Sequence, residues 1–159
     1  MKRIYCYKIG IEYMHSNDTE VRRWVRKKFE KEAETIDLPL EQKKRILKKL
    51  NEGQVFENFL QTKFIGQKRF SLEGGESTIP ALDAIITKGA DLGVEEFVIG
   101  MAHRGRLNVL VNIIGKSHEF VFEEFSGNDK YKYVGGGDVK YHQGYTSVQK
   151  TANDKEVYL

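Results

Sequence analysis

The chain has 159 residues, of which 40% are hydrophobic and 31% are charged, and its formal net charge is +3. This length and balance are typical of one globular domain with a core, and they exclude a low-complexity or fibrous protein. The single cysteine, Cys6, excludes an intrachain disulfide framework and a cysteine-based zinc site. No apolar stretch is long enough to span a membrane, and no signal-peptide core follows Lys2 and Arg3. We therefore expect a cytoplasmic protein.

Most of the basic excess lies in residues 21–49, where clusters of lysine and arginine are mixed with glutamates. Such a mixture is typical of a solvated helical face. It also leaves open an acidic protein partner, so an interaction module is an alternative function. A role in nucleic-acid binding is disfavoured because no RNA-binding signature accompanies the charges.

The first third of the chain is expected to be mostly helical. Residues 1–15 alternate between apolar and polar types, which indicates a strand or an extended arm. Residues 16–18 offer capping side chains for a helix whose apolar stripe begins at Val21 and ends at Phe29. Pro39 suits the first turn of a second helix, and Gly53 is expected to separate it from a third, short helix that ends near Phe64.

The remainder is expected to alternate between strands and helices. Residues 70–76 predict a short strand and a glycine turn before a helix over residues 79–89. Residues 97–101 predict a buried strand, followed by helices over residues 107–115 and 119–125. From residue 126 onward, with three glycines at 135–137, the chain is expected to be a loop without a closing element. The pattern predicts an α/β fold with a parallel sheet, but it holds too few strands to complete one.

Three candidate site residues lie together at the turn between the predicted strand and the helix that follows it. They are His103, Arg104 and Arg106. Guanidinium groups at the start of a helix favour a phosphate or a carboxylate. The alternatives are a structural histidine, and arginines that pair with acidic residues of neighbouring segments.

A second histidine, His142, stands between two tyrosines beyond the three glycines. Such a loop can bring a ring over a ligand, but loops also carry inert surface histidines, and both interpretations stay open. His15 and His118 lack comparable neighbours and are expected to be structural or exposed. The sequence contains no G-x-S-x-G elbow, and no H-E-x-x-H or paired His/Cys spacing typical of a metal site built by the protein.

Four blocks of sequence carry a resemblance to a known family. They are YCYKIGIEYMHS (5–16), FSLEGGES (70–77), GMAHRGRLNVLVN (100–112) and GDVKYHQG (137–144). In order and in detail they resemble the thiamine-dependent first component of 2-oxoglutarate dehydrogenases. The resemblance runs over nearly the whole chain.

The resemblance implies an oxidoreductase activity in the tricarboxylic acid cycle. The parent enzyme would decarboxylate 2-oxoglutarate on thiamine diphosphate with Mg²⁺, and would pass the succinyl group to the lipoyl arm of the dihydrolipoyl succinyltransferase component. His103 and His142 would hold the substrate carboxylates and assist proton transfers, and Arg104 would contact the diphosphate. Arg106 would be a structural or substrate-side cation.

The resemblance also implies that the chain is one part of a larger, homodimeric enzyme. Residues 1–69 would form an N-terminal arm and helical region, and residues 70–159 an incomplete α/β diphosphate-binding domain. The family's thiamine motif and its Mg²⁺ ligands would lie downstream, so we expect this chain to bind no metal, to hold no cofactor alone and to be inactive. A related 2-oxo acid decarboxylase remains an alternative parent.

Overall fold

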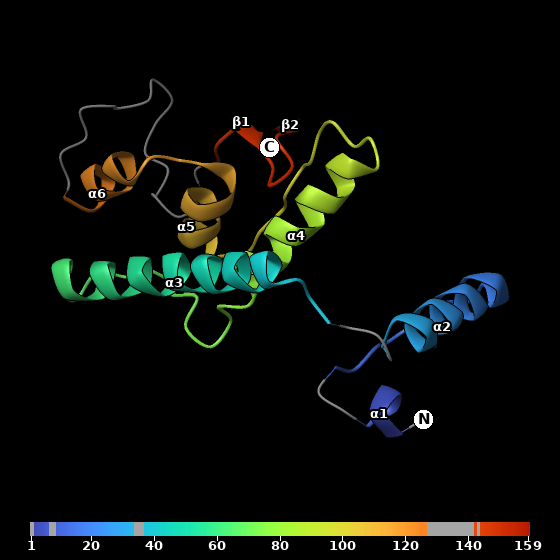
Figure 1. The fold of residues 1–159 in the computed structure, drawn as a ribbon. Helices are drawn as coiled ribbons and strands as arrows, with labels where there is room; N and C mark the ends of the chain where they lie inside the picture. Colours follow the sequence, from blue (N-terminus) through green and yellow to red (C-terminus); the bar gives the residue numbers. More distant parts are fainter. Residues whose placement is uncertain (1, 7–8, 34–36, 127–141, 143) are drawn as a thin grey trace. The chain divides into compact units, whose positions relative to one another are not determined.

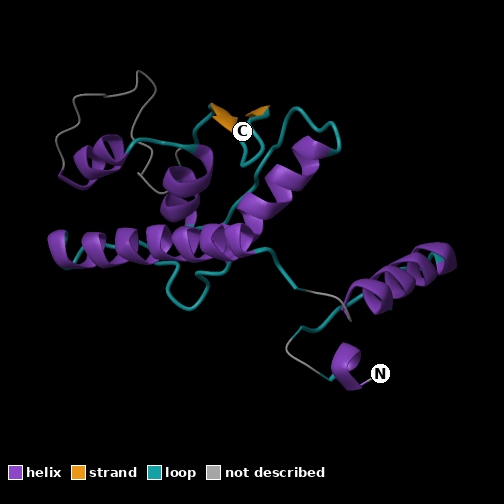
Figure 2. Cartoon of the chain, viewed as in Figure 1, coloured by secondary structure: helices purple, strands orange, loops and turns teal. Residues whose placement is uncertain are grey.

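The computed structural model describes residues 2–6, 9–33, 37–126, 142 and 144–159. It contains two compact units, Met1–Gln42 and Lys43–Leu159, and each is described here by itself. Figures 1 and 2 show a helix-rich chain with one small sheet. The triple glycine at 135–137, which we expected to be a loop, lies outside the described residues.

The first unit contains α1 (Lys2–Tyr5) and α2 (Thr19–Ala33). The predicted helix is confirmed, and its cap is Asp18, whose Oδ1 accepts hydrogen bonds from the backbone N–H groups of Glu20 (2.8 Å) and Val21 (3.3 Å). The strand or extended arm expected at the start of the chain is wrong for residues 2–5. Those residues form one helical turn, with Ile4 buried at 6% exposure.

Tyr5 connects α1 to α2 through two side-chain contacts. Its ring meets Phe29 edge to face at 6.1 Å, and its hydroxyl donates a 2.5 Å hydrogen bond to Oε1 of Glu30. Because the carboxylate holds the phenolic proton, the pKa of Tyr5 rises to about 12. Residues 2–5 thus pack on α2 through side-chain contacts, and do not pair as a strand.

The second unit is built on α3, a single helix that runs from Leu40 to Lys63. The prediction of two helices separated at Gly53 is therefore wrong. Gly53 is buried inside the helix, where Ile79 and Asn108 approach so closely that an added Cβ would lie 3.4 and 3.5 Å from their side chains. The glycine marks a close helix contact and not a break.

Three shorter helices lie along α3 in order (Figure 1). The first, α4 (Thr78–Asp91), is joined to the start of α3 by Arg45 and Asp83, with nitrogen–oxygen distances of 2.6 and 2.7 Å. The second, α5 (Arg106–Val109), meets the middle of α3 at Gly53, and α6 (His118–Ser126) meets its end through the rings of Phe59 and Phe122, which are 4.7 Å apart and tilted by 38°. All three confirm predicted helices, although the one expected over 107–115 continues from α5 as a π-helix, Leu110–Ile114.

The core of this unit lies between α3 and those shorter helices. Its fully buried side chains are Leu60, Ile79, Asn108, Leu110, Val121 and Val157. One of them, Val157, belongs to a hairpin of β1 (Val148–Lys150) and β2 (Glu156–Tyr158), which pair antiparallel. The expectation of a loop without a closing element is thus wrong for residues 148–158.

The strands predicted within residues 70–76 and at 97–101 do not form. Phe70 has a φ of +46° and a turn follows at 73–74, and residues 97–101 have no ladder. Of the latter residues, Phe97 donates a backbone hydrogen bond to Tyr158 (2.9 Å), next to an isolated parallel bridge between Glu96 and Tyr158. Its burial is one-sided, because Val98 is 92% exposed. The described residues therefore display an antiparallel hairpin and not the expected parallel sheet. No helix in the described ranges is both long and apolar enough to cross a membrane.

Candidate functional site

The turn that carries the candidate residues is shaped by Gly105. This glycine has a φ of +72°, and its N–H donates a 2.8 Å hydrogen bond to the carbonyl of Phe70. An added Cβ would collide with Cδ1 of Leu72 and would lie 3.2 Å from two more of its carbons. The turn closes with a 3.1 Å hydrogen bond from the Arg106 N–H to the His103 carbonyl. Only glycine fits both the backbone conformation and the space.

The structure brings the two candidate histidines together. The ring of His103 lies parallel to that of His142, with centroids 5.0 Å apart and planes at 16°. The ring of Phe70 also stacks with His103, at 4.9 Å and 25°. His103 and His142 are both exposed, so a ligand can reach them.

Phe70 is the part of this site that sequence reasoning missed. Its φ of +46° is rare for a bulky residue, and such backbone strain persists only where surrounding contacts enforce it. The contacts here are its carbonyl, which holds Gly105, and its ring, which packs on His103. The block FSLEGGES, in which Phe70 is the first residue, was the only signal in the sequence that could have pointed to it.

The two arginines of the turn are anchored through backbone carbonyls. Nη2 of Arg104 donates to the carbonyl of Glu73 at 2.6 Å. Arg106 donates from Nη1 to the carbonyl of Met101 and from Nη2 to the carbonyl of His142, both at 3.1 Å. Arg106 thus connects the two histidine-bearing segments.

The neighbouring turn, residues 72–76, presents an ionised carboxylate beside Arg104. Oε1 of Glu76 accepts a 2.8 Å hydrogen bond from the N–H of Gly74. The pKa of Glu76 lies below its usual value because of the backbone N–H groups of Glu76 itself and of Gly74, and then because of the charge on Arg104. These backbone donors and the charge of Arg104 therefore stabilise the carboxylate of Glu76.

The other two histidines lie in different surroundings, His15 in the first unit and His118 in the second. His15 is exposed, and His118 packs edge to face on Phe56 with ring centroids 5.8 Å apart. His118 borders an open groove of about 980 Å³ between α3, the π-helix and α6, whose lining includes Lys44, Leu47 and Val55. In the described part of the chain, no three His, Cys, Asp or Glu side chains are grouped so that they could hold a metal ion.

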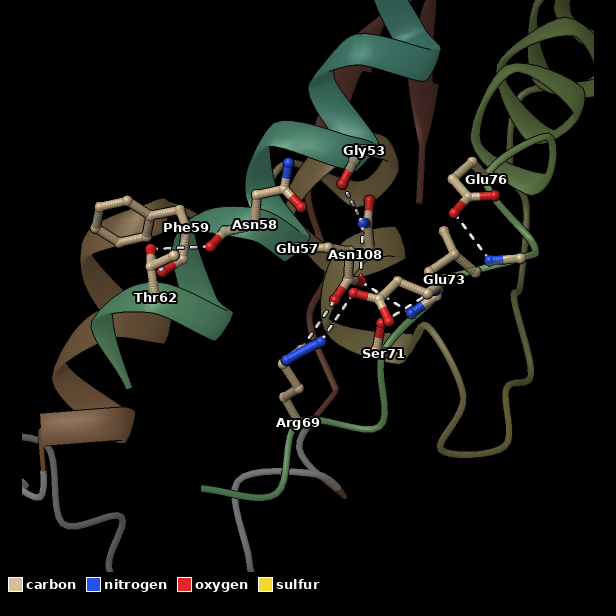
Figure 3. Close-up of polar contacts among 12 residues, drawn as sticks. Gly53, Glu57, Asn58, Phe59, Thr62, Arg69, Ser71, Glu73, Glu76 and Asn108 are labelled. Atoms are coloured by element: carbon tan, nitrogen blue, oxygen red, sulfur yellow. Dashed lines mark hydrogen bonds and ion pairs between the residues drawn. The ribbon is translucent and has the colours of Figure 1, made fainter. Parts of the chain in front are cut away.

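Two buried polar side chains, Glu57 and Asn108, are hydrogen-bonded to each other in the core beneath segments that contact or follow the turn. Figure 3 shows Glu57 of α3 and Asn108 of α5 meeting next to Arg69. Oε1 of Glu57 accepts hydrogen bonds from Nδ2 of Asn108 (3.1 Å) and from the N–H of Leu72 (3.0 Å), and its Oε2 lies 3.6 Å from Nε of Arg69. The sequence does hold a signal for Glu57, because it lies on one helical face with Gly53, Phe56 and Leu60, all buried.

Comparison with known proteins agrees with the motif-based resemblance. Over 157 residues, 98% of its length, the chain is 45% identical to proteins from Brucella canis, Brucella suis and Brucella abortus, each named 2-oxoglutarate dehydrogenase E1 component. The chain resembles a segment of these E1 components. It spans 16% of their length. No protein-family model matches the chain.

The match covers 98% of the chain, and so it takes in the segments that carry the candidate residues. The resemblance inferred from the four sequence blocks is confirmed at the level of the family. The individual roles of the four residues remain predictions.

Proposed function

We propose that this chain forms part of a 2-oxoglutarate dehydrogenase E1 component and supplies residues to its substrate and cofactor sites. The observation that carries the proposal is the stacking of His103 on His142 beside two anchored arginines, in a chain 45% identical to E1 components. A dicarboxylate substrate needs hydrogen-bond donors and positive charge, and this group of side chains provides both.

The two histidines would bind the carboxylates of 2-oxoglutarate. Each imidazole can donate a hydrogen bond to a carboxylate oxygen. Because the rings are parallel and 5.0 Å apart, both can face the same small anion. Arg106 would keep His142 in place through the 3.1 Å contact with its carbonyl.

Arg104 would hold the diphosphate of thiamine diphosphate. The fit rests on its exposed guanidinium group, of which Nη2 is anchored to the carbonyl of Glu73. When bound, thiamine diphosphate would supply the nucleophilic carbon and the electron sink for decarboxylation. Mg²⁺ would be held by residues outside this chain, and residues 70–159 would form one part of the diphosphate-binding α/β domain with its parallel sheet.

The whole enzyme would be a cytoplasmic homodimer in a multienzyme complex, and would transfer the succinyl group to the dihydrolipoyl succinyltransferase component. The isolated chain would have no turnover, because the remaining residues of the site lie elsewhere in the enzyme. Measurable decarboxylation of 2-oxoglutarate by the purified 159-residue chain would contradict this part of the proposal.

A segment exchange tests the function directly. The matching segment of a Brucella E1 component is replaced by this chain, and ferricyanide reduction dependent on 2-oxoglutarate is measured. We expect the chimera to be active, and His103→Ala or His142→Ala to lower kcat far more than stability. His15→Ala, which removes an exposed histidine of the first unit, is the control. A folded chimera with normal kinetics in both site variants would remove the histidines from the reaction.

One observation favours the second candidate, an interaction module. No side chain of α2 is buried in the part of the chain described, and Trp24 is 65% exposed amid basic residues. The basic region at 21–49 would bind an acidic partner or the succinyltransferase core. A pull-down with that core should weaken at high salt if the contact is electrostatic. Binding that salt leaves unchanged would exclude the charge-driven version.

A further inference from the structure

The carboxylate of Glu57 is buried in the core of the second unit. Glu57 is 4% exposed, on the face of α3 that packs against the core. A buried carboxylate is retained only if hydrogen bonds and opposite charge replace the water that it has lost. Removing such a group therefore alters the segments that supply its partners.

Two of those partners belong to segments that contact or follow the histidine turn, Leu72 beside Gly105 and Asn108 in α5. The N–H of Leu72 donates to Glu57, and the Leu72 side chain fills the space beside Gly105. Asn108, in the helix that follows the turn, donates to Glu57 and also to the carbonyl of Gly53 at 2.9 Å. One carboxylate oxygen thus fixes the segment before the turn and the helix after it.

A second line of contacts leads from the same carboxylate towards Arg104. Oε2 of Glu57 lies 3.6 Å from Nε of Arg69, and Nη2 of Arg69 donates to Glu73 at 3.0 Å. The carbonyl of Glu73 accepts the 2.6 Å hydrogen bond from Arg104. Glu57 is therefore linked to His103 through Leu72 and to Arg104 through Arg69 and Glu73.

We propose that Glu57 is a positioning residue that fixes the His103 ring through Leu72 and Asn108. It does not touch the His103 ring itself, so its effect is on geometry. Calling His103 a substrate contact rests on the proposed function, whereas the control of its ring position does not. The two arms of the test separate these statements.

The first arm measures ring geometry in the 159-residue chain by NMR. The His103 ring protons should be displaced upfield, because Phe70 and His142 stack on the ring. We expect Glu57→Ala to abolish that displacement. Glu57→Gln should keep it, because an amide oxygen can still accept from Leu72 and Asn108 while the ion pair with Arg69 is lost.

The matched control is Glu124→Gln. Glu124 forms a comparably buried ion pair with Lys116 at 2.7 Å, on α6 and outside the turn. The Glu124→Gln substitution should destabilise the chain without shifting the His103 ring-proton signals. A folded Glu57→Ala chain with unchanged His103 signals would overturn the proposal. If Glu57→Ala does not fold, Leu72→Ala takes its place, since it removes the side chain through which the Glu57–Leu72 connection reaches Gly105, without uncovering a charge. Unchanged His103 signals there would overturn the proposal.

The second arm uses the chimeric enzyme. Displacing a substrate-binding ring by about 1 Å can cost about 10²-fold in rate, so Glu57→Ala should lower kcat by about that factor and KM less. Glu57→Gln should restore most of kcat, and Glu124→Gln should leave it unchanged. An active chimera in which Glu57→Ala has normal kcat refutes the positioning role. An inactive chimera with the expected NMR result refutes the proposed function alone.

Discussion

Replacing Gly105 by alanine tests whether the histidine turn requires a glycine for its space as well as for its backbone. A non-glycine residue in the left-handed region costs about 1–2 kcal/mol. Overpacking against a buried side chain such as Leu72 adds about 1–3 kcal/mol. We therefore expect Gly105→Ala to lower the free energy of unfolding by about 2–5 kcal/mol.

The matched variant is Gly66→Ala. Gly66 has a similar φ of +78°, but no atom lies within 4 Å of where its Cβ would be. It should lose only the backbone contribution, about 1–2 kcal/mol. Urea unfolding followed by far-UV circular dichroism measures both losses. Equal losses at the two positions would refute the overpacking contribution at Gly105. A loss at Gly66 alone would refute both the overpacking and the backbone contributions at Gly105.

Three further predictions concern residues outside the turn. Gly53→Ala should stabilise the chain by about 0.5–1 kcal/mol, because the new methyl meets only van der Waals neighbours at 3.4 Å or more and alanine favours a helix; a lower urea midpoint would contradict this. Asp83→Asn should cost about 1 kcal/mol, since Arg45 is 38% exposed and water screens the pair; an unchanged midpoint would show that the pair contributes nothing. Finally, the phenol of Tyr5 should ionise near pH 12, and Glu30→Gln should return it towards 10.0, as measured by phenolate absorbance against Tyr5→Phe. The stability from this contact is complete below pH 10 and is lost as the pH rises through about 12, so a Tyr5 that titrates near 10 in the unaltered chain would contradict the contact.

Helices with a clear apolar period could be predicted from the sequence, and strands could not. The stripes of α2, α4 and α6 report which face is apolar, and that information is local. Residues 97–101 are apolar as well, but a strand also needs a partner, and Val98 shows that one side of this segment is uncovered. Gly53 misled for a related reason, because the helix that approaches it comes from a distant part of the chain.

The sequence pointed to the titratable and cationic side chains of the candidate site, but not to the residues that hold them in place. His103 and its arginines could be identified because titratable and cationic groups between a strand-like and a helical pattern suggest a ligand. His142 remained ambiguous alone, since only the folded chain shows that its ring lies on that of His103. Phe70 was missed because its role depends on an unusual backbone conformation, and Glu57 because its role depends on the burial of its carboxylate.

The bonds between α3 and α5 also bear on how the chain folds. Asn108 bonds with Glu57 and Gly53, residues 51 and 55 positions earlier. Closing so long a loop costs entropy that helix formation does not. We expect the helices to form early from local contacts, and the turn between residues 103 and 106 to become ordered only after these remote segments have met. A mutation that slows this late step would leave the helical content intact and would delay the appearance of a binding-competent turn.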